Sequence, residues 1–223
     1  MTATHDIVFL FDVDDTLLDN DGIKDDLGSH IESVFGVQGR KLYDGIYEDV
    51  RRDVDYADYL GAIQRFRLQC GDEIRAQDLG AWMLEYPFAE RLYPGALDAI
   101  AHVSRLGPVV VLSDGDAVIQ PRKISASGIA DAVGGNVLIY VHKETMLDDV
   151  ERRFPARHYV MVEDKLRVLD ALKRHWRERL TTVFVRQGHY AHDPKLVAKY
   201  PPAQITLERI GDLCGCGRED FLR

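Results

Sequence analysis

Cysteine is scarce in this sequence: Cys70, Cys214 and Cys216 are the only three among 223 residues. So few cysteines exclude a disulfide framework, and the fold must be stable without crosslinks. The segment Cys214-Gly-Cys216 has no second Cys or His pair nearby, which argues against a structural metal site there. We therefore expect a protein of a reducing compartment, the cytoplasm.

Long hydrophobic runs are also missing. The longest run near the amino terminus is Ile7–Phe11, which is too short for a membrane span or for the core of a signal peptide. No later run offers a better candidate. The sequence therefore predicts a protein without a membrane partner.

Positive charge is in short supply as well. Lys and Arg total 28 against 37 Asp and Glu, which gives a formal net charge of −9. A nucleic-acid binder needs a basic face, so we exclude nucleic acid as a partner. The overall field would repel an anionic substrate, so such a substrate would need local cations or a metal ion in its site.

What the sequence does contain is a series of short apolar runs separated by helix-compatible segments. Nearly continuous hydrophobicity is typical of strands buried on both faces, and strand–helix alternation is typical of a doubly wound, mostly parallel α/β sheet. The predicted strands span residues 7–11, 108–112, 137–141, 159–162, 182–185 and 203–207. The predicted helices span residues 97–106, 117–127, 144–154, 165–179 and 194–199.

One long segment, residues 19–92, interrupts this alternation. Its apolar residues recur at helical spacing, as in Ile31-Val34-Phe35. Pro94-Gly95 marks the return to the sheet. We therefore predict an α/β core of residues 1–18 and 93–223 and a small helical domain of residues 19–92. We also expect the two strands on either side of the insertion to lie next to each other.

Acidic residues follow the predicted strands at their carboxyl ends, where ligands bind in open parallel sheets. Asp12 and Asp14 follow the first strand two residues apart, so on an extended backbone they face the same side. Asp164 follows the fourth strand. Three carboxylates that meet at one place repel one another unless a hard cation lies among them, and Mg²⁺ prefers such oxygen ligands.

These residue types fit phosphoryl transfer. One carboxylate can attack phosphorus and form an aspartyl-phosphate, while the other protonates the departing alkoxide and then activates water. Ser113 and Lys143, after the second and third strands, are placed to hold phosphoryl oxygens, and the lysine would neutralise developing charge. Lys123 is an alternative for this lysine. A calcium loop after the first strand is excluded, because the later Gly and Glu of that pattern are missing.

Several of these segments resemble the motifs of the haloacid dehalogenase superfamily. Residues 9–18, with Asp12-Val13-Asp14-Asp15-Thr16 at their centre, look like its nucleophile motif. Leu112-Ser113-Asp114-Gly115 is similar to its second motif, Lys143 stands where its third-motif lysine is expected, and Val162-Glu163-Asp164 resembles its fourth. The resemblance covers residues 1–18 and 93–213. It implies a Rossmann-like core with a helical cap inserted after the first motif.

The resemblance also implies a role for each motif residue. Asp12 would be the nucleophile and a Mg²⁺ ligand. Asp14 would be the acid/base and would offer its backbone carbonyl to the metal, and Asp164 would be a further ligand. The residues that would bind the phosphorylated substrate are Thr16, Ser113, Asp114 and Lys143.

The carboxyl group of Asp14 separates the reactions that this superfamily hosts. A halide leaves without a proton whereas an alkoxide needs one, so Asp14 favours phosphate esters over dehalogenation and over phosphonate cleavage. We therefore predict a Mg²⁺-dependent phosphatase that acts on a small phosphorylated metabolite. Two alternatives stay open: a phosphomutase on the same scaffold, and a non-catalytic regulatory protein that binds a phosphorylated ligand. The sequence predicts neither the substrate nor the oligomeric state.

The fourth motif departs from the pattern of the superfamily. Another acid usually stands four or five residues after its aspartate, where this chain has Val168 and Leu169. Two outcomes stay open: the outer shell of the metal is poorer, or Glu163 or Asp170 takes the place of this acid.

Two further groups of residues are expected to be structural. The tyrosines of the insertion should form the core of the helical domain, and the histidines near the strand ends should lie at the surface without a metal-ligand partner. The residues concerned are Tyr43, Tyr47, Tyr56 and Tyr59 in the first group and His142 and His189 in the second.

Overall fold

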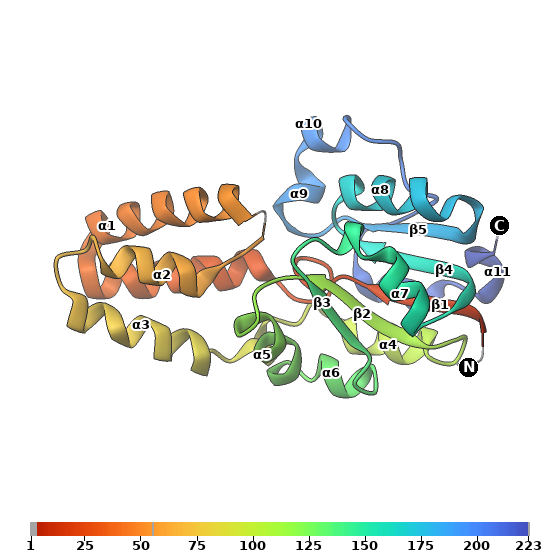
Figure 1. Cartoon of the computed structure of the whole chain (residues 1–223), viewed down its shortest axis with the longest axis horizontal. Coiled ribbons are helices and arrows are strands. Elements are labelled where there is room, and N and C mark those ends of the chain that lie inside the picture. Colours follow the sequence, from red (N-terminus) through yellow and green to blue (C-terminus); the bar gives the residue numbers. More distant parts are fainter. Residues whose placement is uncertain (1–3, 55, 223) are drawn as a thin grey trace.

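A parallel sheet of six strands forms the centre of the computed structural model, which describes residues 4–54 and 56–222 (Figure 1). The strands lie in the order β3-β2-β1-β4-β5-β6. Their bounds are β1 (His5–Phe11), β2 (Val109–Asp114), β3 (Val137–Tyr140), β4 (Ala156–Glu163), β5 (Leu180–Val185) and β6 (Ile205–Leu207). β1 pairs with both β2 and β4, so the strands on either side of the insertion are neighbours. The predicted doubly wound α/β fold is confirmed.

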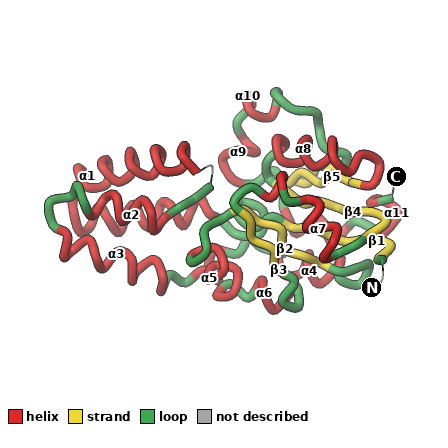
Figure 2. The backbone as a smooth tube through the Cα atoms, in the orientation of Figure 1, coloured by secondary structure: helices red, strands yellow, loops and turns green. Residues whose placement is uncertain are grey.

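Side chains of the central strand point alternately into two hydrophobic layers. Phe9 and Phe11 belong to one buried cluster, and Val8 and Leu10 belong to the other. Helices cover both faces of the sheet (Figure 2). Because both faces of β1 are buried, its sequence is apolar throughout instead of alternating with polar residues.

The helices and turns around the sheet are short. They are η1 (Phe88–Arg91), α4 (Ala96–Val103), α5 (Ile119–Ala126), α6 (Ile129–Ala132), η2 (Lys143–Thr145), α7 (Leu147–Arg153), α8 (Leu166–Trp176), η3 (Arg177–Arg179), α9 (Gly188–His192), α10 (Pro194–Val197), η4 (Ile210–Gly215) and α11 (Arg218–Phe221). The predicted helices overlap α4, α5, α7, α8 and α10. The sequence did not predict α9, η4 and α11, because such short elements show no helical period.

Three further helices form a lobe beside the carboxyl ends of the strands (Figure 1). They are α1 (Asn20–Val54), α2 (Tyr59–Arg67) and α3 (Glu73–Glu85), and we call them the helical lobe. α1 consists of two segments that turn back on each other at Gly36, where φ is 72° and ψ is 179°. Ion pairs of Lys24 with Glu48 and of Arg40 with Asp25 join the two segments. A positive φ costs glycine little, which explains why the turn falls at this residue.

The lobe shares its hydrophobic core with one face of the sheet. Tyr43 and Phe66 of the lobe are buried in the same cluster as Phe9 and Phe11 of β1. The boundaries predicted for a separate domain, residues 19–92, stay a prediction.

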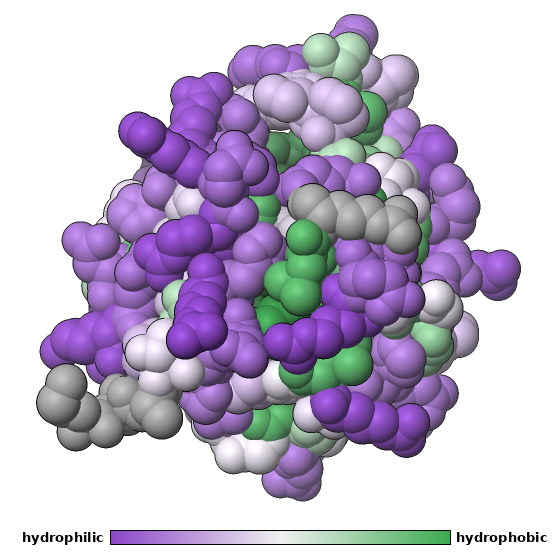
Figure 3. Space-filling view, turned by 90° about the vertical axis from the view of Figure 1, so that its right-hand side faces the viewer, coloured by the Kyte–Doolittle hydropathy of each residue, from purple (hydrophilic) through white to green (hydrophobic). Residues whose placement is uncertain are grey.

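The end of the molecule away from the lobe is mostly hydrophilic around a narrow hydrophobic strip (Figure 3). Among the described residues, no helix combines the length and the hydrophobicity that crossing a membrane requires. The acidic residues that follow β1 and β4 lie at the opposite end of the sheet, toward the lobe (Figure 1).

Candidate active site

A cavity lies between the carboxyl ends of the strands and the helical lobe. The sheet side contributes Asp12, Asp14, Asp15, Ser113, Asp114, Lys165, Arg167, His189 and Tyr190. The side of the lobe contributes Asn20, Asp21, Lys24, Tyr47, Arg51, Tyr56 and Ala57. The cavity therefore combines an acidic floor with cations and aromatic rings on its walls.

Asp12 follows β1 and is held from several directions. Its backbone N–H donates to the Val162 carbonyl at 3.0 Å, which ties the residue to β4. The Lys143 ammonium donates to Asp12 Oδ1 at 2.5 Å, and the Thr16 hydroxyl donates to Oδ2 at 3.4 Å. Burial, and then the charge of Glu163, raise the pKa of Asp12 to about 7, although the Lys143 ammonium acts in the opposite direction. An oriented carboxylate that is so poorly solvated is suited to nucleophilic attack.

Asp14 points into the same cavity and has its own cation. The Lys123 ammonium, which is fully buried, donates to Asp14 Oδ1 at 2.7 Å, and Gln120 Nε2 donates to the same oxygen at 3.4 Å. Within the described chain, Oδ2 of Asp14 makes no hydrogen bond, so this oxygen is available to exchange a proton. Lys123 and Lys143 thus hold different carboxylates, and Lys143 is the lysine on Asp12.

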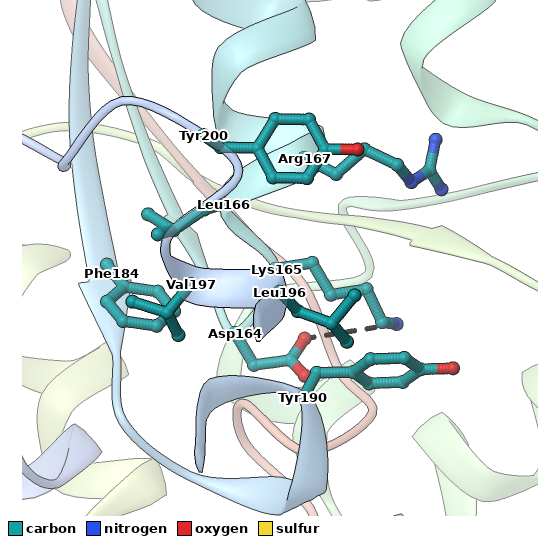
Figure 4. Close-up of a pocket in the computed structure, with 9 residues that line it drawn as sticks. All are labelled: Asp164, Lys165, Leu166, Arg167, Phe184, Tyr190, Leu196, Val197 and Tyr200. Atoms are coloured by element: carbon teal, nitrogen blue, oxygen red, sulfur yellow. Dashed lines mark ion pairs between the residues drawn. The ribbon is translucent and has the colours of Figure 1, made fainter. Parts of the chain in front are cut away.

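Two further carboxylates lie beside that of Asp12. Oxygens of Asp12, Glu163 and Asp164 lie within 4.8 Å of one another. Both oxygens of the buried Asp164 side chain lack a hydrogen-bond partner among the described residues, and the nearest ammonium, of Lys165, is 3.9 Å away (Figure 4). Burial raises the pKa of Asp164 far above its usual range. An unpartnered buried carboxylate next to two others fits a hard cation with oxygen ligands.

Of the two residues expected to replace the acid missing from the fourth motif, Glu163 lies beside Asp164 and Asp170 does not. Val168 and Leu169 are buried in the hydrophobic layer. Asp170 does not line the cavity, and its carboxylate lies 2.6 Å from the guanidinium of Arg174. Glu163 lies in the acidic cluster, with the Lys143 ammonium 2.7 Å from its Oε2. Although burial opposes it, this ammonium lowers the pKa of Glu163, so Glu163 is charged and neutralises Lys143.

The four residues predicted to bind the substrate lie at different depths. Ser113 and Asp114 line the cavity, where Ser113 accepts a hydrogen bond from Gln120 and Asp114 accepts one from the backbone N–H of Lys143. Lys143 is almost completely buried behind Asp12. Thr16 is fully buried as well, and its hydroxyl donates to Asp12. Its contact with the substrate stays a prediction.

Comparison with known proteins places this arrangement in a family. Residues 8–175 match the family model of the haloacid dehalogenase-like hydrolases. The chain belongs to this family. Its members typically use a divalent metal ion, which agrees with the carboxylates around Asp12.

Solved structures agree with the assignment to the haloacid dehalogenase-like hydrolases. A haloacid dehalogenase-like hydrolase of Burkholderia xenovorans is 56% identical, with a TM-score of 0.91 over 96% of this chain and 99% of that one. The hydrolase YfnB of Bacillus subtilis, bound to magnesium, is 14% identical (TM-score 0.65; 94% and 97% of the two chains). The L-2-haloacid dehalogenase of Xanthobacter autotrophicus is 16% identical (TM-score 0.61; 93% and 96%). The last two show the shared fold alone. No curated protein matches the sequence.

A second polar cluster in this hydrolase was not predicted. The carboxylate of Asp15 accepts hydrogen bonds from the backbone N–H groups of Asn20 and Asp21 at the start of α1. Asp21 in turn accepts from the backbone N–H of His189 at 2.8 Å, and its Oδ1 lies 2.6 Å from His189 Nδ1. His189 is exposed and lies in the short helix α9, as expected, but the expectation that no ligand partner lies near it is wrong, because Asp15 and Asp21 are close enough to share a metal ion with it. Asp21 and His189 are 168 positions apart, and no local pattern joins them.

The tyrosines of the helical lobe divide between the core and the cavity. Tyr43 and Tyr59 are fully buried, and the Tyr59 hydroxyl donates to Asn20 Oδ1. Tyr47 and Tyr56 line the cavity of this hydrolase. A helical period predicts which residues face inward, but not whether they face a cavity or packed side chains.

Gly188 allows the loop after β5 to approach Asp15, in the segment that follows β1. Its φ is +66°, and a Cβ there would lie 2.4 Å from Cβ of Asp15. We expect Gly188→Ala to displace Asp15, to lower turnover at least about tenfold and to destabilise the fold through overpacking by roughly 1–3 kcal/mol beyond the strain of the backbone. Chemical denaturation and steady-state kinetics test this expectation.

Gly134→Ala is the matched control for this substitution. Gly134 has a φ of +61°, but a Cβ there meets no described atom within 4 Å. Gly134→Ala should therefore lower the free energy of unfolding by the backbone strain alone, about 1–2 kcal/mol, and leave turnover unchanged. Equal losses of stability and turnover in the two variants would contradict a steric role of Gly188 beside Asp15.

Proposed function

We propose that this hydrolase is a Mg²⁺-dependent phosphatase that acts on a small phosphorylated metabolite through an aspartyl-phosphate at Asp12. The observation that carries the proposal is the pair of carboxylates in one cavity: Asp12, buried and held by Lys143, and Asp14, held by Lys123 through one oxygen only. The first has the environment of a nucleophile, and the second has that of an acid/base. A dehalogenase has no use for the second, because a halide leaves unprotonated.

Mg²⁺ would be held by Asp12 and Asp164, with Glu163 in reach and the backbone carbonyl of Asp14 as a further predicted ligand. When bound, Mg²⁺ supplies positive charge that draws electron density from the phosphoryl oxygens. Ser113 lines the cavity, and its hydroxyl would donate a hydrogen bond to a phosphoryl oxygen. Lys143 compensates the negative charge of Asp12 and Glu163 from behind.

The reaction proceeds in two steps on the residues of the chain. A carboxylate oxygen of Asp12 attacks phosphorus, the bond from phosphorus to the ester oxygen breaks, and Asp14 gives its proton to the leaving alkoxide. Asp14 then takes a proton from a water molecule that attacks the same phosphorus, which releases inorganic phosphate and restores the carboxylate of Asp12. The same group serves as acid and then as base, as it must return to its starting state.

A panel of phosphate monoesters, including an aryl phosphate, tests this proposal with and without Mg²⁺. We expect release of inorganic phosphate that stops when the metal is chelated. Recovery of the phosphoryl group on a sugar hydroxyl, instead of as inorganic phosphate, would indicate a phosphomutase. Binding of phosphorylated ligands without turnover of any ester would indicate a regulatory protein and overturn the proposal.

Asp164→Asn tests the metal site separately from the chemistry. The substitution keeps an oxygen donor but removes a charge, so we expect at least about a tenfold increase in the Mg²⁺ concentration for half-maximal rate, with turnover partly recovered at high metal. Asp170→Asn is the control, because Asp170 pairs with Arg174 outside the cavity. An unchanged Mg²⁺ midpoint in Asp164→Asn would place the metal elsewhere.

A further inference from the structure

We infer that the substrate carries a carboxylate in addition to its phosphoryl group, and that Arg51 of the helical lobe and Lys165 of the core bind this carboxylate beside the ring of Tyr190. The inference rests on the proposed function, because it names the class of phosphate ester that the cavity accepts. It depends on three residues that no step of the proposed reaction uses.

Arg51 brings an uncommitted guanidinium to the wall of the catalytic cavity. It lines the cavity that holds Asp12, and about a quarter of its side chain is exposed. Its guanidinium makes no hydrogen bond within the described part of the chain, and its nearest carboxylate oxygen, Oε2 of Glu48, is 3.7 Å away. Glu48 is engaged more closely by Lys24, at 2.6 Å. A guanidinium has five donors in a planar fork that matches a carboxylate, so this side chain has unused binding capacity.

Lys165 brings a second cation to the same place. Its ammonium is 3.9 Å from Asp164 and makes no hydrogen bond to any described residue. The ring of Tyr190 connects the two cations, since the Lys165 ammonium and the Arg51 guanidinium both lie 4.9 Å from its centroid. Figure 4 shows the ammonium of Lys165 next to this ring. The two residues also line a mostly apolar pocket with Leu166, Phe184, Leu196, Val197 and Tyr200. Arg51, Lys165 and Tyr190 line the same cavity, so the two cations together favour an anion that reaches both of them.

The described acidic residues of the cavity do not supply that anion. Asp21 is hydrogen bonded to His189, Asp15 to the start of α1, and Asp114 to the backbone of Lys143. Asp14 is paired with Lys123. Two other cations of the cavity are engaged as well, Lys24 by Glu48 and Arg167 by Glu144. In a chain whose net charge is −9, the described residues therefore attract an anion mainly at Arg51 and Lys165. Asp164 already balances part of the charge on Lys165, so a singly charged carboxylate fits this place better than a second phosphate.

Binding of two small phosphonates tests the inference without requiring turnover. Phosphonoacetate carries a phosphonate and a carboxylate, whereas methylphosphonate lacks the carboxylate. By calorimetric titration in excess Mg²⁺, we expect phosphonoacetate to bind about 10- to 100-fold more tightly than methylphosphonate. This is the gain in affinity that one charge-assisted hydrogen-bonded pair provides. Arg51→Gln should remove this preference and leave methylphosphonate binding unchanged, and Arg51→Lys should retain part of it.

Arg52→Gln is the matched control, because Arg52 is three-quarters exposed, pairs with Asp49 and does not line the cavity. It should keep the full preference. Equal affinity of the wild-type protein for both phosphonates overturns the inference, and so does a preference that survives in Arg51→Gln.

Hydrolysis of 3-phosphoglycerate and glycerol 3-phosphate, which differ only at the carboxylate, separates this inference from the proposed function. Faster turnover of the carboxylated ester supports both. Equal turnover supports the phosphatase and overturns the carboxylate subsite. Absence of turnover together with a preference for phosphonoacetate overturns the phosphatase and supports the subsite.

Discussion

Asp12→Asn is expected to abolish turnover while it stabilises the metal-free protein. The amide keeps the shape of the side chain but cannot attack phosphorus, so kcat should fall by roughly 10⁴-fold or more, as for other nucleophile deletions. Burial, and then the charge of Glu163, raise the pKa of Asp12 to about 7, above the value of an unfolded chain. The folded state therefore binds this proton more tightly than the unfolded state does, and the contribution of Asp12 to stability falls as the pH rises from about 4 to about 7.

The expected signature of Asp12→Asn is thus a stability advantage over the wild type that grows between pH 4 and pH 7. Thermal unfolding in the presence of a chelator measures it. Asp148→Asn is the control, because its side chain is almost fully exposed and should change neither stability nor turnover. Turnover that survives in Asp12→Asn would rule out the covalent mechanism. A constant stability difference across the pH range would show that Asp12 is well solvated.

The loss of turnover caused by Asp14→Asn is expected to depend on the leaving group of the substrate. For alkyl phosphates, whose alkoxides need a proton, kcat should fall by about 10²- to 10⁴-fold. For an activated aryl phosphate the loss in the first step should be small, because the phenolate leaves without help. Rapid quenching should then show phosphorylated protein accumulating, since the variant also lacks the base for the second step. An equal loss for both ester types would mean that Asp14 only positions Asp12 or the metal.

The sequence predicted the sheet and the acidic residues of the site because both depend on local patterns. The apolar run of β1 and the two carboxylates after it are contiguous, and the order of motifs after β2, β3 and β4 follows from the geometry of a parallel sheet. Lys143 was distinguished from Lys123 only by its place after β3. The structure separates them by contact: Lys143 lies on Asp12 and Lys123 lies on Asp14.

Other parts of the site depend on long-range packing that no local pattern encodes. The contact of Asp21 with His189 requires the loop after β5 to pass over the start of α1, which Gly188 permits by bringing its backbone against Asp15. Arg51 reaches the cavity because α1 turns back at Gly36, and no local pattern indicates which residues of the lobe face the sheet. The complete burial of Thr16 could not be predicted for the same reason.

The most direct test of the central proposal is to measure phosphate and halide release by one preparation of the wild-type protein. The substrates are an aryl phosphate and L-2-chloropropionate, each with Mg²⁺ and with a chelator. Because the proposal makes Asp12 the nucleophile and Asp14 the proton donor, and because the carboxylates beside Asp12 fit a metal ion, we expect Mg²⁺-dependent release of inorganic phosphate and no release of chloride. Chloride release that persists in the chelator, with no phosphate release, would contradict the account.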